Sequence, residues 1–328
     1  MKSKIGFALL GLALLASCTK ETDMNVVPEG QEIITLGVTT GAGTRAAIND
    51  LPALSASAAG VGIYGQATTA AAANTSITSE WTATPLMKNV KTTAIDVTTG
   101  AMKWDAVYAY PNTAPLNVKF FAYYPYAGES TSGDNYVKAA SAGTAPVLTF
   151  KLTGEEDLMW ATPVLGSRTQ PASALKFNHQ LTQLSFKLVD GDGSFSDMIT
   201  SVGLTTNTTA KMNLETGALS EWAGSKSLML NTSNIDMTKG TLTGNNENKE
   251  REVTLPKTVM LQPEQTSFAL TIIAGGNKTA TIKPVGESTF KAGKAYLITL
   301  RLTGDVPVQL GAEVIPWVTG GVGEGNVE

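Results

Sequence analysis

The chain has 328 residues, of which 42% are hydrophobic and 16% are charged, against about 25% charged residues in typical globular proteins. Its formal net charge is −4 and it has one cysteine. The negative charge argues against nucleic acid as a partner, because phosphate binding needs basic patches, and a single cysteine excludes an intramolecular disulfide. The length is sufficient for two domains of roughly 150 residues each.

The N-terminus predicts an exported lipoprotein. Lys2 and Lys4 precede an apolar run over residues 5–16, and Leu-Ala-Ser-Cys follows at residues 15–18. This is the pattern of a secretory signal, and a run of about 12 apolar residues is too short to span a membrane. Leu-Ala-Ser-Cys resembles the lipobox read by the bacterial lipoprotein signal peptidase. We therefore expect residues 1–17 to be removed and Cys18 to carry lipid at the outer membrane; the alternative is an ordinary secretory signal with an incidental thiol.

Beyond the signal, the sequence predicts short strands. Residues 19–30 are polar and rich in turn formers, which is typical of a tether. From about residue 31 the chain changes to short β-type runs separated by Gly, Pro, Asn and Asp. Strands are expected over residues 33–39, 60–64, 118–124, 147–152, 158–161, 175–177, 184–189, 201–204, 253–260, 268–274 and 296–302.

The period of the hydrophobic pattern favours an all-β fold. Phe268, Leu270 and Ile272 alternate with other residues, which predicts one row in a core and one toward solvent. No window of a dozen residues has a helical stripe, and many short strands with turns between them predict β-sandwiches. The polar, Pro-containing stretch 166–173 suggests a boundary near residue 170. It divides an N-terminal domain over residues 46–170 from a C-terminal domain over residues 171–328.

An alternating strand near the N-terminus precedes a candidate cleavage site. Ile34, Leu36 and Val38 form its apolar row. Arg45 and Ala46 follow in a stretch of small and polar residues, and exposed stretches of this kind are where proteases cut. A cut between them would remove residues 18–45 and leave an open edge and a hydrophobic groove.

A second clean alternation lies at the other end of the chain. Pro307 stands in its other row and cannot donate a ladder hydrogen bond, which suits an edge or an added strand. Residues 305–328 are therefore a candidate donor strand for the groove of another subunit; the alternative is the last strand of their own domain. The apolar row consists of Val306, Val308, Leu310, Ala312 and Val314.

Several segments together resemble the fimbrillins, the pilin subunits of type V pili. They are Phe-Phe-Ala-Tyr-Tyr-Pro-Tyr at 120–126, Asp-Leu-Met-Trp-Ala at 157–161, the run at 177–188 and Ile-Pro-Trp-Val-Thr-Gly at 315–320. The resemblance implies two transthyretin-like β-sandwich domains in tandem. It also implies removal of the lipidated N-terminal segment by a protease that cuts after an arginine, and growth of a cell-surface fimbrium by donor-strand exchange.

The resemblance implies partners for this protein but no catalytic reaction. It implies other pilin subunits in a homo- or heteropolymer, the arginine-specific protease, the outer membrane and a part in cell adhesion. His179 is the only histidine, so a metal cluster built from several histidines is excluded, and we expect His179 to be a hydrogen-bonded structural residue and not a catalytic base. The acidic run Glu155–Asp157 suits a solvated turn better than a cation site. We predict a protein that is not an enzyme and has no catalytic residue, cofactor or metal.

A surface-anchored, glycan-binding β-sandwich lipoprotein is the alternative function. Its platform would be the aromatic cluster Phe120, Phe121, Tyr123 and Tyr124. Strand alternation sends Phe120 and Tyr124 to the face opposite Phe121 and Tyr123, so the four rings cannot share one platform. The pattern therefore favours core positions for these rings.

Overall fold

Strands account for most of the regular structure. The computed structural model describes residues 31–40, 48, 50–191, 193–243, 250–303 and 306–315. Its helices are short: α1 (Leu51–Ala56) and the 3-10 turns η1 (Thr78–Glu80) and η2 (Met237–Lys239). The Asp50 side chain caps α1 by accepting from Ala53 N at 2.8 Å, and a proline stands in its first turn. The all-β prediction is confirmed.

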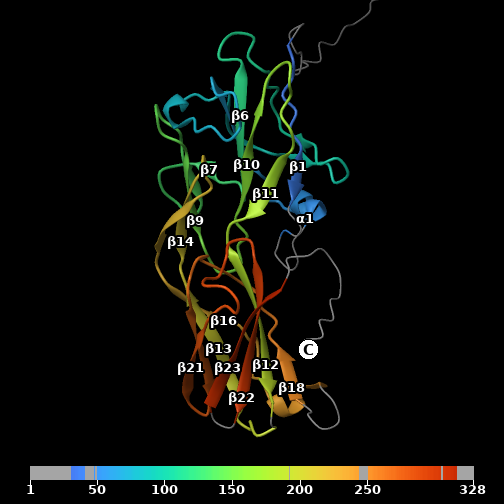
Figure 1. Cartoon of the computed structure of the whole chain (residues 1–328), viewed down its shortest axis with the longest axis vertical. Helices are drawn as coiled ribbons and strands as arrows, with labels where there is room; N and C mark the ends of the chain where they lie inside the picture. Colours follow the sequence, from blue (N-terminus) through green and yellow to red (C-terminus); the bar gives the residue numbers. More distant parts are fainter. Residues whose placement is uncertain are drawn as a thin grey trace, which may run out of the picture.

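The first lobe, uppermost in Figure 1, holds two sheets. One has the order β1 (Val38–Thr40), β11 (Leu175–His179), β10 (Met159–Gly166), β6 (Asn117–Tyr124), β2 (Gly62–Thr68), β3 (Met87–Lys91). The other has the order β15 (Leu219–Ala223), β14 (Thr209–Asn213), β9 (Val147–Lys151), β8 (Tyr136–Lys138), β7 (Gly128–Glu129). A small hairpin pairs β4 (Ala94–Ile95) with β5 (Met102–Lys103).

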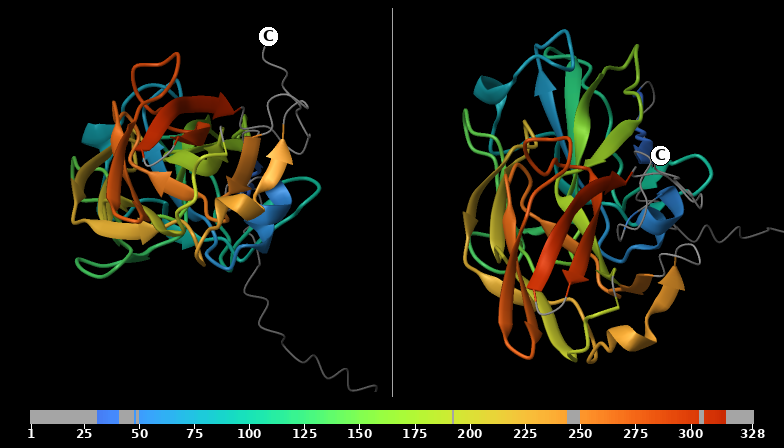
Figure 2. Two further views of the ribbon diagram at one scale, coloured as in Figure 1. Left: turned by 90° about the horizontal axis from the view of Figure 1, so that it is seen from below. Right: turned by 60° about the horizontal axis from the view of Figure 1, so that its bottom comes forward.

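The second lobe is a sandwich of two further sheets (Figures 1 and 2). One has the order β17 (Thr241–Thr243), β18 (Glu250–Thr254), β12 (Thr182–Asp190), β22 (Ala295–Thr303), β23 (Val306–Ile315), with β19 (Val259–Leu261) also paired to β12. The other has the order β16 (Lys226–Met229), β13 (Ile199–Thr206), β20 (Phe268–Ala274), β21 (Asn277–Ile282). Their inner rows, which include Phe186, Val202 and Ile272, form one core.

Strand β6 serves two cores in the first lobe. Phe121 and Tyr123 belong to the core shared with the sheet of β9 and β14. Phe120 and Tyr124 belong to the core on the opposite face, together with the N-terminal segment and α1. The strand is therefore buried on both faces, which explains its nearly continuous run of apolar and aromatic residues.

The pairing departs from a boundary at residue 170. Strand β11 lies beyond that residue but pairs with β10 and β1 in the first lobe. The hairpin β14–β15 also lies beyond it, yet β14 pairs with β9. The polar stretch at 166–173 is the connection between β10 and β11 within one sheet, and the chain enters the second lobe at β12. The first lobe therefore also contains β11 and the hairpin β14–β15, and the two lobes are not two consecutive stretches of chain.

Candidate functional site: the N-terminal strand and its groove

The described part of the N-terminal segment, residues 31–40, carries one buried row. Ile34, Leu36 and Val38 are exposed by only 1%, 2% and 1%. At alternate positions Thr35 and Thr39 face solvent, and Ile33 is 40% exposed. The segment thus fills a groove in the core of the first lobe with its apolar side chains and presents its polar side chains outward.

Backbone pairing holds this segment on both sides. On one side β1 runs parallel to β11, and the carbonyl of Gly37 accepts from Leu175 N at 2.8 Å. On the other side of the N-terminal segment lie residues 100–110, which we call the strap. The hydrogen bonds to the strap are Ile34 N to Tyr108 O (2.8 Å), Val38 N to Gly100 O (2.9 Å), Met102 N to Leu36 O (3.0 Å) and Tyr110 N to Glu32 O (3.0 Å).

A glycine allows the strap to approach this closely. Gly100 has a φ of +74°, and a Cβ there would lie 2.3 Å from the carbonyl oxygen of Val38. The turn before it is held by Asp96, whose carboxylate accepts from the backbone N–H groups of Thr98 and Thr99. Hydrogen bonds to the carboxylate, above all from the Thr99 N–H, hold the pKa of Asp96 below its ordinary value.

The groove has apolar walls with one aromatic hydroxyl. Tyr110 is buried beside Phe120, and its hydroxyl accepts from Ala172 N at 2.9 Å. Burial raises the pKa of Tyr110, so the phenol stays neutral. Three fully buried side chains at about 1.5–3 kcal/mol each give the N-terminal strand a gross apolar stabilisation of roughly 5–9 kcal/mol. The remaining walls include Ile48, Leu54, Ile63, Ile95, Met102, Leu175 and Phe177.

The expected lipidation and processing residues, Cys18, Arg45 and Ala46, lie outside the described residues. The described residues on either side of this stretch are Thr40 and Ile48. Ile48 is 4% exposed and belongs to the same core as the N-terminal strand. A cut between Arg45 and Ala46 would separate that strand from Ile48 and α1. The processing site stays a prediction.

The candidate donor strand pairs within its own chain. Strand β23 lies at the edge of its sheet and runs antiparallel to β22, from Thr303↔Val306 to Ala295↔Ile315. The backbone of Val306, Val308, Leu310, Ala312 and Val314 is described as part of this strand, but their side chains lie outside the described part. Donation to another subunit therefore stays a prediction.

The acidic run and the only histidine have structural roles. Asp157 Oδ1 lies 2.8 Å from His179 Nδ1, and the two side chains are almost fully buried where β10 begins and β11 ends. Glu156 accepts from the N–H groups of Thr153 and Gly154 and so closes the preceding turn. Within the described ranges, no group of three His, Cys, Asp or Glu side chains is placed to hold a metal. None of the helices in those ranges has the length and apolarity that a bilayer crossing requires.

The aromatic cluster is not a binding platform. Phe120, Phe121 and Tyr123 are fully buried and Tyr124 is 8% exposed. As the alternation predicts, they divide between the two cores of the first lobe. Their rings therefore stabilise the lobe and are closed to a glycan.

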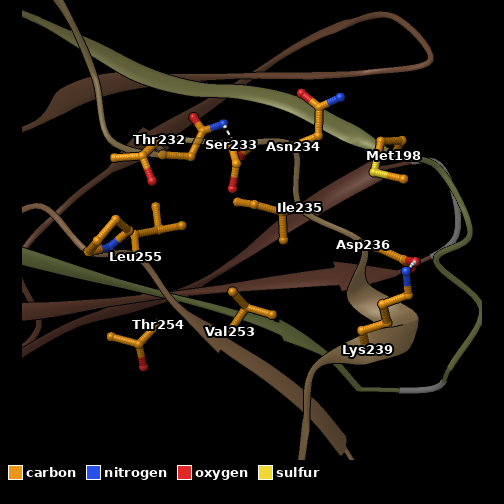
Figure 3. A pocket seen from close by; sticks show the side chains of 12 residues that line it. Met198, Thr232, Ser233, Asn234, Ile235, Asp236, Lys239, Val253, Thr254 and Leu255 are labelled. Atoms are coloured by element: carbon orange, nitrogen blue, oxygen red, sulfur yellow. Dashed lines mark hydrogen bonds and ion pairs between the residues drawn. The ribbon is translucent and has the colours of Figure 1, made fainter.

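A pocket of about 480 Å³, which we call the slot, lies in the second lobe (Figure 3). It lies between residues 231–236 and the end of β18, and its lining includes the buried apolar side chains of Ile235 and Leu255. The Asn231 amide makes its hydrogen bonds within the protein: Oδ1 accepts from Val202 N, and Nδ2 donates to Thr200 O and Ser233 O. Both of its polar atoms therefore have a partner without a ligand. None of the lining residues is aromatic, so the slot offers no stacking surface for a sugar ring.

Reasoning from the sequence missed the strap. Its residues pair through isolated bridges, Ile33↔Ala109 and Gly37↔Ala101, and not through a regular ladder. The available signal was the Asp-Val-Thr-Thr-Gly turn at 96–100 between Ile95 and Met102, both of which are buried.

Comparison with known proteins identifies the family. The fimbrillin-like family matches residues 44–317. The chain belongs to the fimbrillin-like family. The resemblance found in the sequence is thereby confirmed, over a range that includes every strand except β1. No curated protein is similar enough in sequence to count as a relative.

Solved structures share the fold of this fimbrillin-like chain. A fimbrial protein of Bacteroides vulgatus has 17% identity and a TM-score of 0.56, with 87% of this chain and 98% of that chain covered. A candidate cell adhesion protein of Bacteroides uniformis has 20% identity and a TM-score of 0.52 over the same shares. Another from Bacteroides ovatus has 14% identity and a TM-score of 0.50, covering 89% and 99%. At these identities the likeness establishes a common fold.

Proposed function

We propose that this fimbrillin-like protein is a structural pilus subunit that polymerises by protease-triggered donor-strand exchange and contributes to cell adhesion. It is exported as an outer-membrane lipoprotein through Cys18, and an arginine-specific protease cuts after Arg45. The groove emptied by residues 18–45 then accepts a strand from another pilin subunit. The cell-surface fimbrium grows by repetition of this step.

The observation that carries the proposal is the way the N-terminal strand is held. Its buried row, Ile34, Leu36 and Val38, fills a core position, and its backbone is paired with β11 and with the strap. Losing it would expose an apolar groove and two sets of unpaired backbone groups, and an extended segment with alternating apolar side chains satisfies both.

The C-terminal segment has the chemistry that this groove requires. The apolar row from Val306 to Val314 alternates with other residues over nine positions, and Pro307 suits an edge or an added strand. Because β23 is at the edge of its sheet, its outer side faces no further strand of that sheet. A strand in this position can leave with less disturbance than a central one.

Brief treatment of residues 19–328 with an arginine-specific protease tests the proposal. We expect a new N-terminus at Ala46 and a ladder of multimers on an unheated denaturing gel. Arg45→Ala should abolish both, whereas Arg168→Ala, in an exposed loop, is the matched control and should leave the ladder intact. A normal ladder from Arg45→Ala would reject Arg45 as the processing site.

The donor strand has its own matched pair of variants. Leu310→Asp places a charge in the apolar row, and Gln309→Asp places the same charge in the alternate row. Under donor-strand exchange the first loses the ladder and the second keeps it, while both are still cut at Arg45. Equal ladders from the two variants would point to a donor other than this row. A folded protein that resists cutting at Arg45 would favour a permanently anchored lipoprotein.

A further inference from the structure

Within their bounds, the strands β16, β13, β20 and β21 place no charged side chain on the outer face of their sheet; Lys283 stands one residue beyond the end of β21. Residues directly opposite one another in antiparallel strands point to the same side, and Val202, Leu270 and Ile272 define the inner side by their burial. The pairing register gives the outward residues as Asn277, Ile273 and Ser201 in one row, Thr279, Thr271, Gly203 and Met229 in the next, and Thr281, Ala269, Thr205 and Ser227 in the third. We call these residues the neutral face.

The opposite sheet of the same lobe provides the contrast. Lys187 alternates with buried Phe186 and Leu188, so it points outward, and it pairs with Glu252 at 2.9 Å. Beside it Arg301 pairs with Glu250. Solvated sheet faces usually carry charges of this kind, and the neutral face lacks them within the same sandwich.

The edges of the neutral sheet are protected although its face is not. In the strand register Lys226 on β16 is opposite Thr206, and Lys278 on β21 is opposite Ile272. Both lysines therefore belong to the rows on the other side of the sheet from the neutral face. Lysines on edge strands oppose edge-to-edge pairing. Any association of this sheet is thereby directed to its face.

The neutral face has a projection next to a hollow. Met229 is 52% exposed and Ile273 is 42% exposed. Met229 lies directly opposite Gly203 in the register, and beside them is a hollow of about 270 Å³ that Met229 lines together with Ser201, Thr205 and Thr271. A projection and a hollow side by side make a surface that complements itself when a copy is turned through 180°.

We propose that the neutral face is the contact surface for a second copy of this chain. The contact is isologous, with Met229 of each copy entering the hollow at Gly203 of the other. The chain is acidic, and removal of Lys2 and Lys4 with the signal leaves it more so; two copies therefore repel one another, and the face without charges is where they approach at the lowest electrostatic cost. The absence of charge and the self-complementary shape of the neutral face therefore both favour a second copy of this chain as its partner.

The size of the face sets the strength of the contact. Strands spaced by about 4.8 Å and rows spaced by about 6.8 Å give roughly 400 Å² per copy. A total of about 800 Å² is below the area of a stable complex, so free subunits associate weakly. The consequence for pili rests on the proposed function: subunits in a polymer repeat the contact, and many weak contacts in register hold two pili side by side.

Sedimentation of uncleaved residues 19–328 up to about 1 mM tests the contact. We expect a concentration-dependent dimer that rising NaCl does not weaken, since no ion pair contributes to it. Met229→Lys should weaken it at least about tenfold, because an unpaired ammonium would be buried. Leu242→Lys is the matched control, since Leu242 is 53% exposed on β17 outside the neutral face, and it should change nothing. Equal effects of the two lysines, or a dimer lost at high salt, overturn the proposal.

Thiol cross-linking gives a second readout. Residues 19–328 contain no cysteine, so Met229→Cys and Leu242→Cys each carry one thiol. A short bifunctional maleimide should link Met229→Cys into dimers about ten times faster than Leu242→Cys, and equal rates overturn the contact. Neither measurement uses cleavage at Arg45. A polymer ladder without this dimer would reject the neutral-face contact alone, and the dimer without a ladder would reject the pilus function alone.

Discussion

Glu215 links the two halves of the chain, and its replacement is the sharpest test of how they are joined. It lies in the turn between β14 and β15, the hairpin that completes a sheet of the first lobe. Its carboxylate is 8% exposed. The donors to it are Ile77 N (2.7 Å), Ser76 Oγ (2.8 Å), Thr78 Oγ1 (2.8 Å) and Trp81 Nε1 (3.1 Å).

The magnitude follows from what each donor would lose. In Glu215→Ala the hydroxyls of Ser76 and Thr78 can turn to water, because both residues are exposed. The N–H groups of Ile77 and Trp81 are buried, and each unsatisfied buried donor costs about 1–3 kcal/mol. We therefore expect the free energy of unfolding to fall by about 2–6 kcal/mol. Glu215→Gln keeps one acceptor oxygen and should cost about 1–3 kcal/mol.

The pH dependence has a definite sign. Burial raises the pKa of Glu215, but the hydrogen bonds from Ser76, Ile77, Thr78 and Trp81 outweigh burial and leave the pKa below its ordinary value. A carboxyl whose pKa is lower in the folded than in the unfolded state stabilises the protein above the unfolded pKa, about 4.3. This stabilisation is lost as the pH falls through the folded pKa, so the difference between wild type and Glu215→Gln should shrink below about pH 4.3.

Urea unfolding of residues 19–328 at pH 7 and at lower pH measures these effects. Glu221→Gln on the same hairpin is the control, because Glu221 forms an exposed ion pair with Lys211, and such pairs contribute about 0–1 kcal/mol. If Glu215→Gln cost no more than Glu221→Gln, or if its cost were the same at pH 3 and pH 7, the carboxylate would not be the link inferred here.

Three further predictions concern the groove and the lobe junction, each measured by urea unfolding of the uncleaved chain. Gly100→Ala should cost about 2–4 kcal/mol, because a Cβ at a φ of +74° meets the carbonyl of the N-terminal strand; a neutral result would mean that the strap can withdraw. Leu36→Ala should cost about 2–5 kcal/mol and its neighbour Thr35→Ala less than about 0.5 kcal/mol, and similar values would contradict the buried row. Asp157→Ala should cost about 2–3 kcal/mol by removing the buried acceptor beside His179, and no loss would show that the pair is dispensable.

The alternation of apolar residues predicted strands and core positions that depend on neighbouring residues alone. The expected strand over residues 268–274 coincides with β20, and the parity of the aromatic run assigned Phe120 and Phe121 to opposite cores. In both cases the period of two fixes which side chain enters a core, and no distant partner has to be known.

The pairing of strands that are far apart in the chain could not be predicted from the sequence. The strand β14 has only Ala210 and Met212 in its buried row, a signal too short to predict a strand. Its assignment to a sheet of the first lobe depends on β9, far away in the chain. The polar stretch at 166–173 resembles a linker because loops and linkers have the same composition. Only the pairing of β11 with β10 identifies it as a loop within one sheet.

The two-sided pairing of the N-terminal strand defines what cleavage accomplishes under the proposed function. Before the cut the strand is tethered at an effective concentration in the millimolar range. After the cut it is a separate peptide, and at about 1 μM its occupancy of the groove is disfavoured roughly a thousandfold, or about 4 kcal/mol. That loss offsets roughly half of the gross stabilisation of about 5–9 kcal/mol from its three buried side chains, before ordering costs. A donor with five apolar side chains offers roughly 8–15 kcal/mol on the same scale. Cutting one peptide bond therefore weakens the hold of the N-terminal strand on the groove, and a donor that replaces it must also offset the loss of its own pairing with β22.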